Sequence, residues 1–417
     1  MTSLSPPPMR AFCWFLLLLP WVYLPGVSDA FLWPKEMVWQ IGVPLLLGLD
    51  LLGGGSLLMG YRNPWLGRFL AWVLCWAGVQ FWWPLLTHRP DAGAFSTNPA
   101  PWMLSLNILL GVLLLWWLVT HHLLRYQACV RLTQTLCWSG AIVATYALLQ
   151  FFRYDPLFDS TVRTVLYFGH PYYSYQFMLG AMGNPGYVAM YLALILPLCL
   201  VMAHPKYLVM FGLMATVLVL IEARYAQASA LAGVLTYGWL RVRERFHLWA
   251  TLAYLLTIGT GLSLAIPRLL SDERWPIWWE TALRWKRQFL NGYGLGSFKT
   301  AFYDQWTQLQ GLSPNLLKFP TPWAWTHNDA LQLGYELGAI GVVLLLLALW
   351  RPILSMREKL TALQPSVRIL MAGWAGAGAS LLCLSLTNFP WHLVPCAAVG
   401  LCIVAMWAAP DPKGVVT

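Results

Sequence analysis

Residues 331–350 read LQLGYELGAIGVVLLLLALW, a run of twenty residues with a single charge. A helix needs about 20 predominantly apolar residues to cross the hydrocarbon core of a bilayer. Comparable runs recur along the chain, which has 417 residues, 59% of them hydrophobic and 10% charged. Soluble domains carry about 25% charged residues. The composition therefore excludes an ordinary cytoplasmic enzyme, a disordered chain and a DNA-binding domain.

The apolar runs predict an all-α polytopic membrane protein with about twelve transmembrane helices. The first predicted span has a second interpretation, because Arg10, an apolar stretch and Ser28-Asp29-Ala30 also suit a cleaved signal peptide. The predicted spans cover residues 11–25, 37–59, 66–87, 102–120, 133–152, 186–203, 207–222, 226–241, 247–265, 331–350, 366–388 and 391–409.

The distribution of Lys and Arg orients these spans, because cytoplasmic loops carry an excess of basic residues. With the amino terminus inside, the cytoplasmic side holds fourteen of the 26 basic residues, and the short external loops hold five. The other seven lie in one long connection, residues 266–330, which is exempt from the rule because of its length. We therefore expect both termini inside and the long connection outside.

The long connection divides the chain into four predicted segments. Residues 1–180 hold spans one to five with an external loop, and residues 181–265 hold spans six to nine. Residues 266–330 form the large external loop, and residues 331–417 hold the last three spans and a tail. Loops of this length are usually functional or disordered. Its tryptophans argue against disorder and suit a membrane interface or a platform for sugar rings; they are Trp275, Trp278, Trp279, Trp285, Trp306, Trp323 and Trp325.

Three polar stretches lie on the expected external side, and the first opens the sixth span. It reads Gly183-Asn184-Pro185-Gly186. Asn184 suits the cap of a helix and Pro185 its first position, so capping alone explains the pattern. A role of Asn184 in substrate binding is the functional alternative.

The second stretch, residues 272–287, predicts an amphipathic helix at the membrane interface. Arg274 and Trp278 lie near its start, and Arg284, Lys286 and Arg287 lie near its end. Cations on an external surface are often simply solvated. Beside a membrane they could instead clamp the phosphates of a lipid carrier, because a guanidinium group offers fork-like donors to phosphate oxygens.

The third stretch, Thr326-His327-Asn328-Asp329, runs directly into the span 331–350. His327 is expected at the external mouth of that helix, where imidazole is the usual general base at neutral pH. A lone interfacial histidine is more often structural, but the density of polar residues here favours catalysis, with Asn328 as a candidate for substrate binding. The remaining histidines, His392 among them, have no such polar company in the sequence.

Motifs for metal and cofactor chemistry are missing from the sequence. No DxD motif is present, and the first external loop offers only Asp29 and Glu36 as carboxylates for a divalent ion. GxSxG, HExxH and Walker motifs are absent, and the eight cysteines form no CxxC pair. We expect an enzyme that uses no cofactor and no bound metal, and that has no nucleic-acid partner.

Together the three stretches resemble the O-antigen ligase/polymerase superfamily of bacterial envelope glycosyltransferases. The resemblance covers residues 180–350 by motif and the rest of the chain by helix count only. It implies a GT-C-like fold whose large periplasmic loop contains short helices. The matching pieces are GNPGYVAMYLALILPL (183–198), RWPIWWETAL (274–283), GYGLGSF (292–298) and THNDALQLGYELGAIGVV (326–343).

The resemblance implies a metal-independent, inverting glycosyltransferase of the bacterial inner membrane, with its active site on the periplasmic face. Such an enzyme takes a glycan from an undecaprenyl-diphosphate carrier and transfers it to a sugar hydroxyl of lipid A-core. His327 corresponds to the catalytic base for the acceptor hydroxyl. Arg274 corresponds to the loop arginine that binds the diphosphate or stabilises the leaving group, with Trp278, Arg284, Lys286 and Arg287 as further candidates for substrate binding.

One departure from the family concerns the start of the eighth span. Where the family has Ser-Arg-Gly-Ala, this chain has Gln227-Ala228-Ser229-Ala230. Arg224, one helical turn earlier, could supply the missing cation to the substrate, or it could pair with Glu222.

Other acceptors suit the same chemistry. Transfer to another carrier-linked repeat unit would make the protein an O-antigen or exopolysaccharide polymerase, and transfer to a protein hydroxyl is a third reading. Membrane lipids are partners in each case. The non-enzyme alternative is a transporter or flippase, which predicts charges buried at mid-membrane and often internal repeats. Only Asp50 meets the first condition in the sequence, and no repeat is evident, so the enzyme is favoured.

Overall fold

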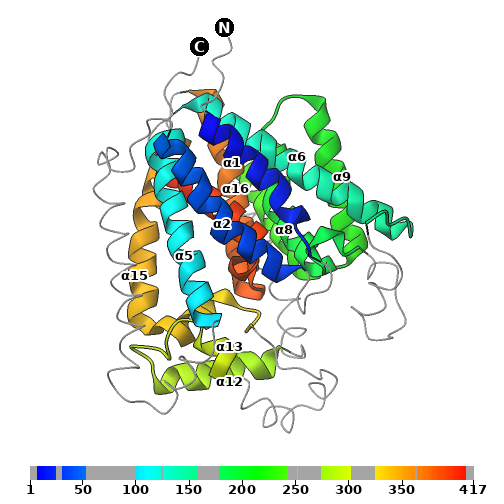
Figure 1. The fold of residues 1–417 in the computed structure, drawn as a ribbon. Coiled ribbons are helices and arrows are strands. Elements are labelled where there is room, and N and C mark those ends of the chain that lie inside the picture. The colour runs from blue at the N-terminus through cyan, green and yellow to red at the C-terminus, as the bar shows by residue number, and fades with distance from the viewer. Residues whose placement is uncertain are drawn as a thin grey trace.

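The computed structural model describes residues 7–24, 31–52, 100–123, 125–157, 178–242, 251, 274–301, 325–361 and 364–409. Within these ranges the regular elements are all helices, which confirms the predicted all-α fold. Figure 1 shows the long helices packed side by side as a bundle, with the short helix α12 lying across one end of it.

Each predicted span that falls on described residues coincides with a helix; the span 66–87 lies outside them, and of the span 247–265 only residue 251 is described. The helices of the bundle are α1 (Pro7–Leu18), α2 (Leu32–Leu52), α5 (Ala100–Trp117), α6 (Tyr126–Phe151), α8 (Pro185–Cys199), α9 (Pro205–Ile221), α10 (Arg224–Arg241), α15 (Asp329–Leu360), α16 (Pro365–Thr387) and α17 (Val394–Ala408), and α12 (Trp275–Arg287) lies across their end (Figure 1). The shorter elements are η1 (Leu19–Trp21), the π-helix η3 (Leu118–His122), η5 (Gly180–Met182), α13 (Ser297–Ala301) and η9 (Pro390–His392).

Three of the described helices, α6, α15 and α16, are long and apolar enough to cross a membrane. On α15 a row of apolar side chains is exposed, including Leu346 and Leu347 at 61% and 62%. A soluble protein seldom leaves such a row uncovered, so the row suits contact with lipid. The number of twelve spans and the GT-C-like layout remain predictions.

Helix α15 is longer than its predicted span, which ended at Trp350. It continues to Leu360 and includes the basic residues Arg357 and Lys359 in its last turn. The ammonium group of Lys359 donates hydrogen bonds of 2.9 Å to the carbonyl oxygens of Met406 and Trp407 in α17. A charged residue can remain in a buried part of the helix because its donors are satisfied there.

Helix α8 lies at the centre of the bundle. The residues from Val188 to Leu196 are at most 4% exposed, and the helix packs against α6, α9, α10 and α16. A helix that is apolar on every side is expected to be buried on every side. The first turn of α8 is therefore held rigidly, and the ends of the neighbouring helices pack around it.

Helices α10 and α16 touch through glycines. A Cβ atom at Gly376 would lie 2.6 Å from the carbonyl oxygen of Gly233, and one at Gly233 would meet the hydroxyl of Ser380 and lie 2.7 Å from the carbonyl oxygen of Gly376. Small residues that let two backbones approach are the usual device for packing helices in membranes. The start of α10 and the end of α16 are consequently held close together.

Gly338 interrupts α15 with φ 66° and ψ 179°, which lies outside the helical region. The break exposes backbone groups that are satisfied by the segment following α12. The amide of Tyr293 donates to the carbonyl of Tyr335 (2.9 Å), and the amide of Ala339 donates to the carbonyl of Phe289 (2.8 Å). Irregular backbone at membrane depth is tolerated only where protein or a polar cavity satisfies it.

Candidate functional site

The candidate site lies where α8, α10, α12 and α15 begin and α16 ends. Two contacts bring these ends together. The guanidinium Nη1 of Arg274, which precedes α12, donates to the carbonyl of Thr387 at 3.2 Å. The amide of Asp329, the first residue of α15, donates to the carbonyl of Asn388 at 3.1 Å. Helix ends that lie far apart in the sequence, between residues 184 and 388, thus meet at one end of the bundle (Figure 1).

His327 lies in a short connection, residues 325–328, that local hydrogen bonds hold in place. The Thr326 hydroxyl donates to the Asn328 carbonyl at 2.6 Å, and the indole nitrogen of Trp278 donates to the Thr326 carbonyl at 2.7 Å. Asn328 caps α15, because its side-chain oxygen accepts from the amide of Leu331 at 3.0 Å. These bonds fix the backbone on both sides of the histidine.

The backbone of His327 is left-handed, with φ 56°. Few residues other than glycine adopt this conformation, and such strain persists only where the surroundings enforce it. Strained residues cluster at functional sites. The conformation therefore supports a role for this residue beyond filling space.

The ring of His327 packs edge-on against Phe389, with centroids 4.7 Å apart. Burial and, after it, the positive charge of Arg274 lower the pKa of His327 from 6.5 to about 3, while the Asn388 side chain acts in the opposite direction. The imidazole is consequently neutral at pH 7. A neutral imidazole can accept a proton, which a protonated one cannot.

Arg274 is the cation whose charge lowers the pKa of His327. Besides its bond to Thr387, its guanidinium carbon lies 5.4 Å from the centroid of the Tyr225 ring, at the start of α10. Stacking of a guanidinium on an aromatic face is favourable by about 0.5–2 kcal/mol. Two elements, α16 and α10, thus hold Arg274 in place.

Gly186, the second glycine of the GNPG stretch, leaves space for the Tyr225 side chain. A Cβ atom at Gly186 would collide with the Tyr225 hydroxyl. Asn184 caps α8 through its side-chain oxygen, which accepts from the amide of Gly186 at 2.7 Å. The capping prediction is thereby confirmed, and the exposed Asn184 side chain lies beside the Tyr225 hydroxyl, within reach of the site.

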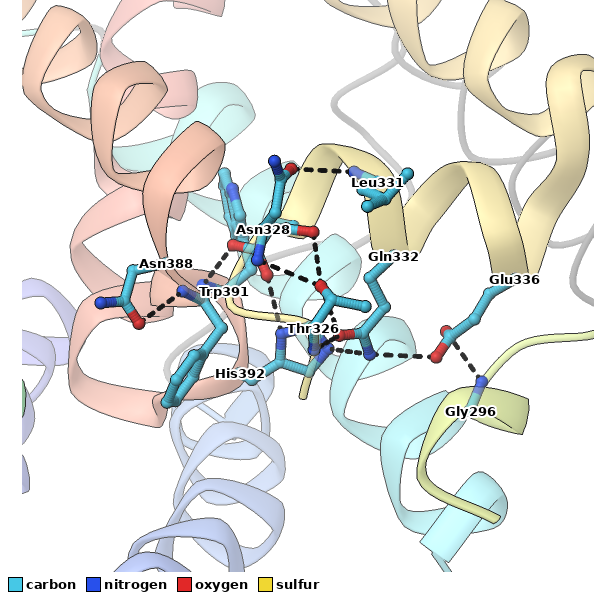
Figure 2. Close-up of polar contacts among 11 residues, drawn as sticks. Gly296, Thr326, Asn328, Leu331, Gln332, Glu336, Asn388, Trp391 and His392 are labelled. Atoms are coloured by element: carbon cyan, nitrogen blue, oxygen red, sulfur yellow. Dashed lines mark hydrogen bonds and ion pairs between the residues drawn. The ribbon is translucent and has the colours of Figure 1, made fainter. Parts of the chain in front are cut away.

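Behind His327, a chain of buried polar side chains joins α15 to the turn before α17 (Figure 2). Gln332 donates from Nε2 to Glu336 Oε1 at 3.0 Å and lies 3.1 Å from His392 Nε2. His392 Nδ1 lies 2.9 Å from Asp329 Oδ1, and Glu336 Oε2 accepts from the amide of Gly296 at 2.9 Å. Because a carboxylate only accepts, His392 carries its proton on Nδ1 and receives the Gln332 amide on Nε2.

Two features of this chain of residues were not predicted from the sequence. His392 has no polar company in the sequence, yet it bonds Asp329 and Gln332, which lie about 60 residues earlier. The polar residues at the start of α15 are buried within the protein: Asp329, Gln332 and Glu336 are 1–2% exposed. Both the contacts of His392 and the burial of these polar residues arise because η9 packs against α15. Neither can be predicted from the sequence around each residue.

The cations at the far end of α12 do not converge on His327. Arg284 is ten residues beyond Arg274, which places it roughly 15 Å further along the helix axis. Its Nε atom forms an ion pair of 2.7 Å with Glu280. Lys286 and Arg287 are exposed on the same terminal turn. Any part they play in binding lies away from the histidine.

Arg224 is exposed at the first position of α10. It lies four residues before Ala228, so the two occupy one face of the helix, and Ala228 is exposed as well. The described ion pairs do not include one between Arg224 and Glu222. Tyr225, rather than Arg224, is the residue of this turn that contacts Arg274.

The sequence analysis missed Tyr225, Asn388 and Phe389. Tyr225 is adjacent to the candidate Arg224, and the other two end α16, so each looked like an ordinary boundary residue. Their place in the site depends on the close packing of α10 against α16, to which only the glycines of the two helices give a signal.

Among the described residues, no group of three His, Cys, Asp or Glu side chains could hold a metal ion. In comparisons with known proteins, no family model and no curated sequence matches this chain. The arrangement of the site itself is therefore the basis for the function proposed below.

Proposed function

We propose that this protein is an O-antigen ligase-like glycosyltransferase, which moves a glycan from an undecaprenyl-diphosphate carrier to a hydroxyl of lipid A-core at the periplasmic face of the inner membrane. One observation carries the proposal: a neutral, partly buried histidine lies within the electrostatic influence of a fixed arginine at one end of an apolar bundle. The motifs that contain His327 and Arg274 also resemble those of the O-antigen ligase/polymerase superfamily, which further supports the proposal.

His327 and Arg274 suit the two requirements of a glycosyl transfer, which are removal of the acceptor proton and stabilisation of the negative charge on the leaving group. His327 removes the proton of the acceptor hydroxyl, and the oxygen attacks the anomeric carbon of the donor sugar. The bond between that carbon and the phosphate oxygen breaks, and the diphosphate takes the electron pair. Arg274 stabilises the negative charge that develops on the leaving group. Attack from the side opposite the leaving group inverts the anomeric configuration.

The environment of His327 links donor binding to proton transfer. Without substrate, burial and the charge of Arg274 both oppose protonation of the imidazole. A diphosphate bound at Arg274 neutralises that charge and so raises the pKa of His327. The histidine is therefore a stronger base when the donor is in place.

A test in the bacterial host replaces the gene with one that encodes His327→Asn. Asparagine tolerates the left-handed backbone, so the variant is expected to fold. We expect long glycan to disappear from lipid A-core and to accumulate on the undecaprenyl carrier, as seen on a gel of envelope glycolipids. His204→Asn, at the exposed N-cap of α9, is the matched control and leaves the ladder unchanged.

Two other outcomes of this test have defined meanings. A core that carries a single repeat unit in the variant identifies a polymerase of the same superfamily. A ladder identical to that of the wild type, at equal protein level, overturns the proposal and returns the protein-acceptor and transporter readings.

A transporter or flippase is the second candidate, and Asp50 favours it. Asp50 is 8% exposed, accepts from the indole nitrogen of Trp117 at 2.9 Å and lies 3.8 Å from His122 Nε2. Ionisable residues buried in membrane helices often belong to transport pathways. The π-helix that holds His122 is also a form frequent at functional sites.

A further inference from the structure

Tyr225 touches both halves of the site described above. Its ring carries the guanidinium of Arg274, with the guanidinium carbon 5.4 Å from the ring centroid. Its hydroxyl group lies against Gly186 at the start of α8 and next to the Asn388 side chain. The Asn388 side chain in turn lies next to His327. One side chain therefore connects the cation and the histidine by two different parts of its structure.

We infer that Tyr225 is a positioning residue that sets Arg274 and His327 relative to each other, its ring holding the arginine and its hydroxyl holding the histidine through Asn388. This inference rests on the proposed transferase function for its catalytic meaning. The positioning itself is a physical claim about these four side chains.

The surroundings of Tyr225 make it a rigid support. The Ser229 hydroxyl donates to the Tyr225 carbonyl at 2.7 Å, one turn along α10. The glycine contact between α10 and α16 fixes the distance from Tyr225 to the residues that end α16. Asn388 is itself held, because its side-chain oxygen accepts from the amide of Phe389 at 3.1 Å. A small rotation of Tyr225 would consequently displace Arg274 and Asn388 together.

The two parts of the side chain can be removed separately. Tyr225→Phe keeps the ring and loses the hydroxyl, whereas Tyr225→Leu loses both. With phenylalanine, Arg274 stays in place, so KM for the carrier-linked donor remains that of the wild type while kcat falls at least about tenfold. With leucine, Arg274 is released, so KM for the donor rises as well.

A measurement without substrate tests the same claim. Diethyl pyrocarbonate acylates neutral imidazole, and mass spectrometry of the full-length protein in nanodiscs reports the rate at His327. In the wild type and in Tyr225→Phe, the rate corrected for reagent chemistry declines only as the pH approaches about 3. In Tyr225→Leu, burial still lowers the pKa of His327, but the arginine charge moves away, so the decline begins at a higher pH than in the wild type.

Matched variants complete the experiment. Tyr154→Leu removes an exposed tyrosine far from Arg274 in the sequence and leaves every value unchanged. Should Tyr225→Leu fail to show cooperative unfolding, Gly186→Ala displaces the Tyr225 hydroxyl from the α8 side and is expected to lower kcat as Tyr225→Phe does.

A Tyr225→Leu protein with the wild-type KM and the wild-type acylation profile overturns the inference, and so does a Tyr225→Phe protein, or Gly186→Ala in its place, with the wild-type kcat. The acylation profile decides whether the Tyr225 ring positions Arg274 relative to His327 even where no glycan transfer is detected. A failure of the proposed function is therefore distinguishable from a failure of this inference.

Discussion

At the scale of single residues, His327 combines two unusual physical properties. Its backbone is left-handed, and its surroundings lower its pKa to about 3. Sequence reasoning found this histidine from its polar neighbours and its place before an apolar run. It could not find the cause of the depressed pKa, because burial and Arg274 come from segments that meet only in the folded chain.

The pKa of His327 predicts how stability depends on pH. The folded protein resists protonation at this site until about pH 3, whereas the unfolded chain binds the proton below about pH 6.5. Acid therefore favours the unfolded state, and this part of the stability is lost as the pH falls through that interval. The melting temperature of the wild type in nanodiscs should decline more steeply below pH 6.5 than that of His327→Asn.

The control for this pH dependence of the melting temperature is His204→Asn, which changes an exposed histidine at the start of α9. This variant should keep the pH dependence of the wild type. Equal slopes for the wild type and His327→Asn would contradict the buried, uncharged state of His327.

At the scale of elements, apolar runs and caps predicted helix positions well, because both are local properties. Asn184 and Asn328 begin α8 and α15 as capping residues. The break at Gly338 was not predicted. It depends on residues 289–294, about 45 positions earlier, which pair with the backbone groups that the break exposes. A lone glycine in an apolar run gives no sign of such a partner.

Substitution of Gly338 tests the importance of this break. A Cβ atom there would collide with the Leu290 carbonyl and lie 2.5 Å from the Gly292 amide nitrogen, at a backbone angle that alanine rarely adopts. Gly338→Ala should lower the free energy of unfolding by about 2–4 kcal/mol, because of strain and lost hydrogen bonds. Differential scanning fluorimetry of the purified protein would measure this as a lower melting temperature.

Gly238→Ala in α10 is the matched control, since a Cβ atom at Gly238 meets no atom within 4 Å. Alanine in a helix interior is favoured over glycine by about 1 kcal/mol, so this variant should melt at the same temperature or higher. If both variants melted alike, the backbone pairing at Gly338 would have no part in stability.

At the scale of the whole molecule, the candidate site and Asp50 lie at opposite ends of the bundle. α2 begins beside η5, where the Lys35 ammonium group donates to the Ala181 carbonyl at 2.8 Å. Asp50 is fifteen residues further along α2, roughly 22 Å away. This separation lets one substitution test each end without disturbing the other.

Asp50→Asn keeps an acceptor for Trp117 while removing the charge. A transferase whose chemistry lies at His327 should keep its full glycan ladder in this variant, within about twofold of the wild-type amount. A ladder lost in Asp50→Asn and retained in His327→Asn would instead favour a transporter.

The function of the whole molecule was the part least accessible to sequence reasoning. The motifs suggested which residues to examine, and the structure brings Arg274 and His327 together. It also adds Tyr225 and Asn388, which no motif contains. Arg284, Lys286 and Arg287 were expected to bind substrate together with Arg274, but the length of α12 separates them from Arg274.

The central claim is that His327 and Arg274 transfer a glycan from a lipid diphosphate. The most direct measurement reconstitutes the purified protein in nanodiscs with an undecaprenyl-diphosphate-linked glycan and lipid A-core, in the presence of a chelator. We predict transfer with inversion at the anomeric carbon by the wild type, and a rate lower by about 10²–10⁴-fold for His327→Asn. Transfer by His327→Asn at the wild-type rate, or none by the folded wild type with this donor and any hydroxyl acceptor, would contradict the account.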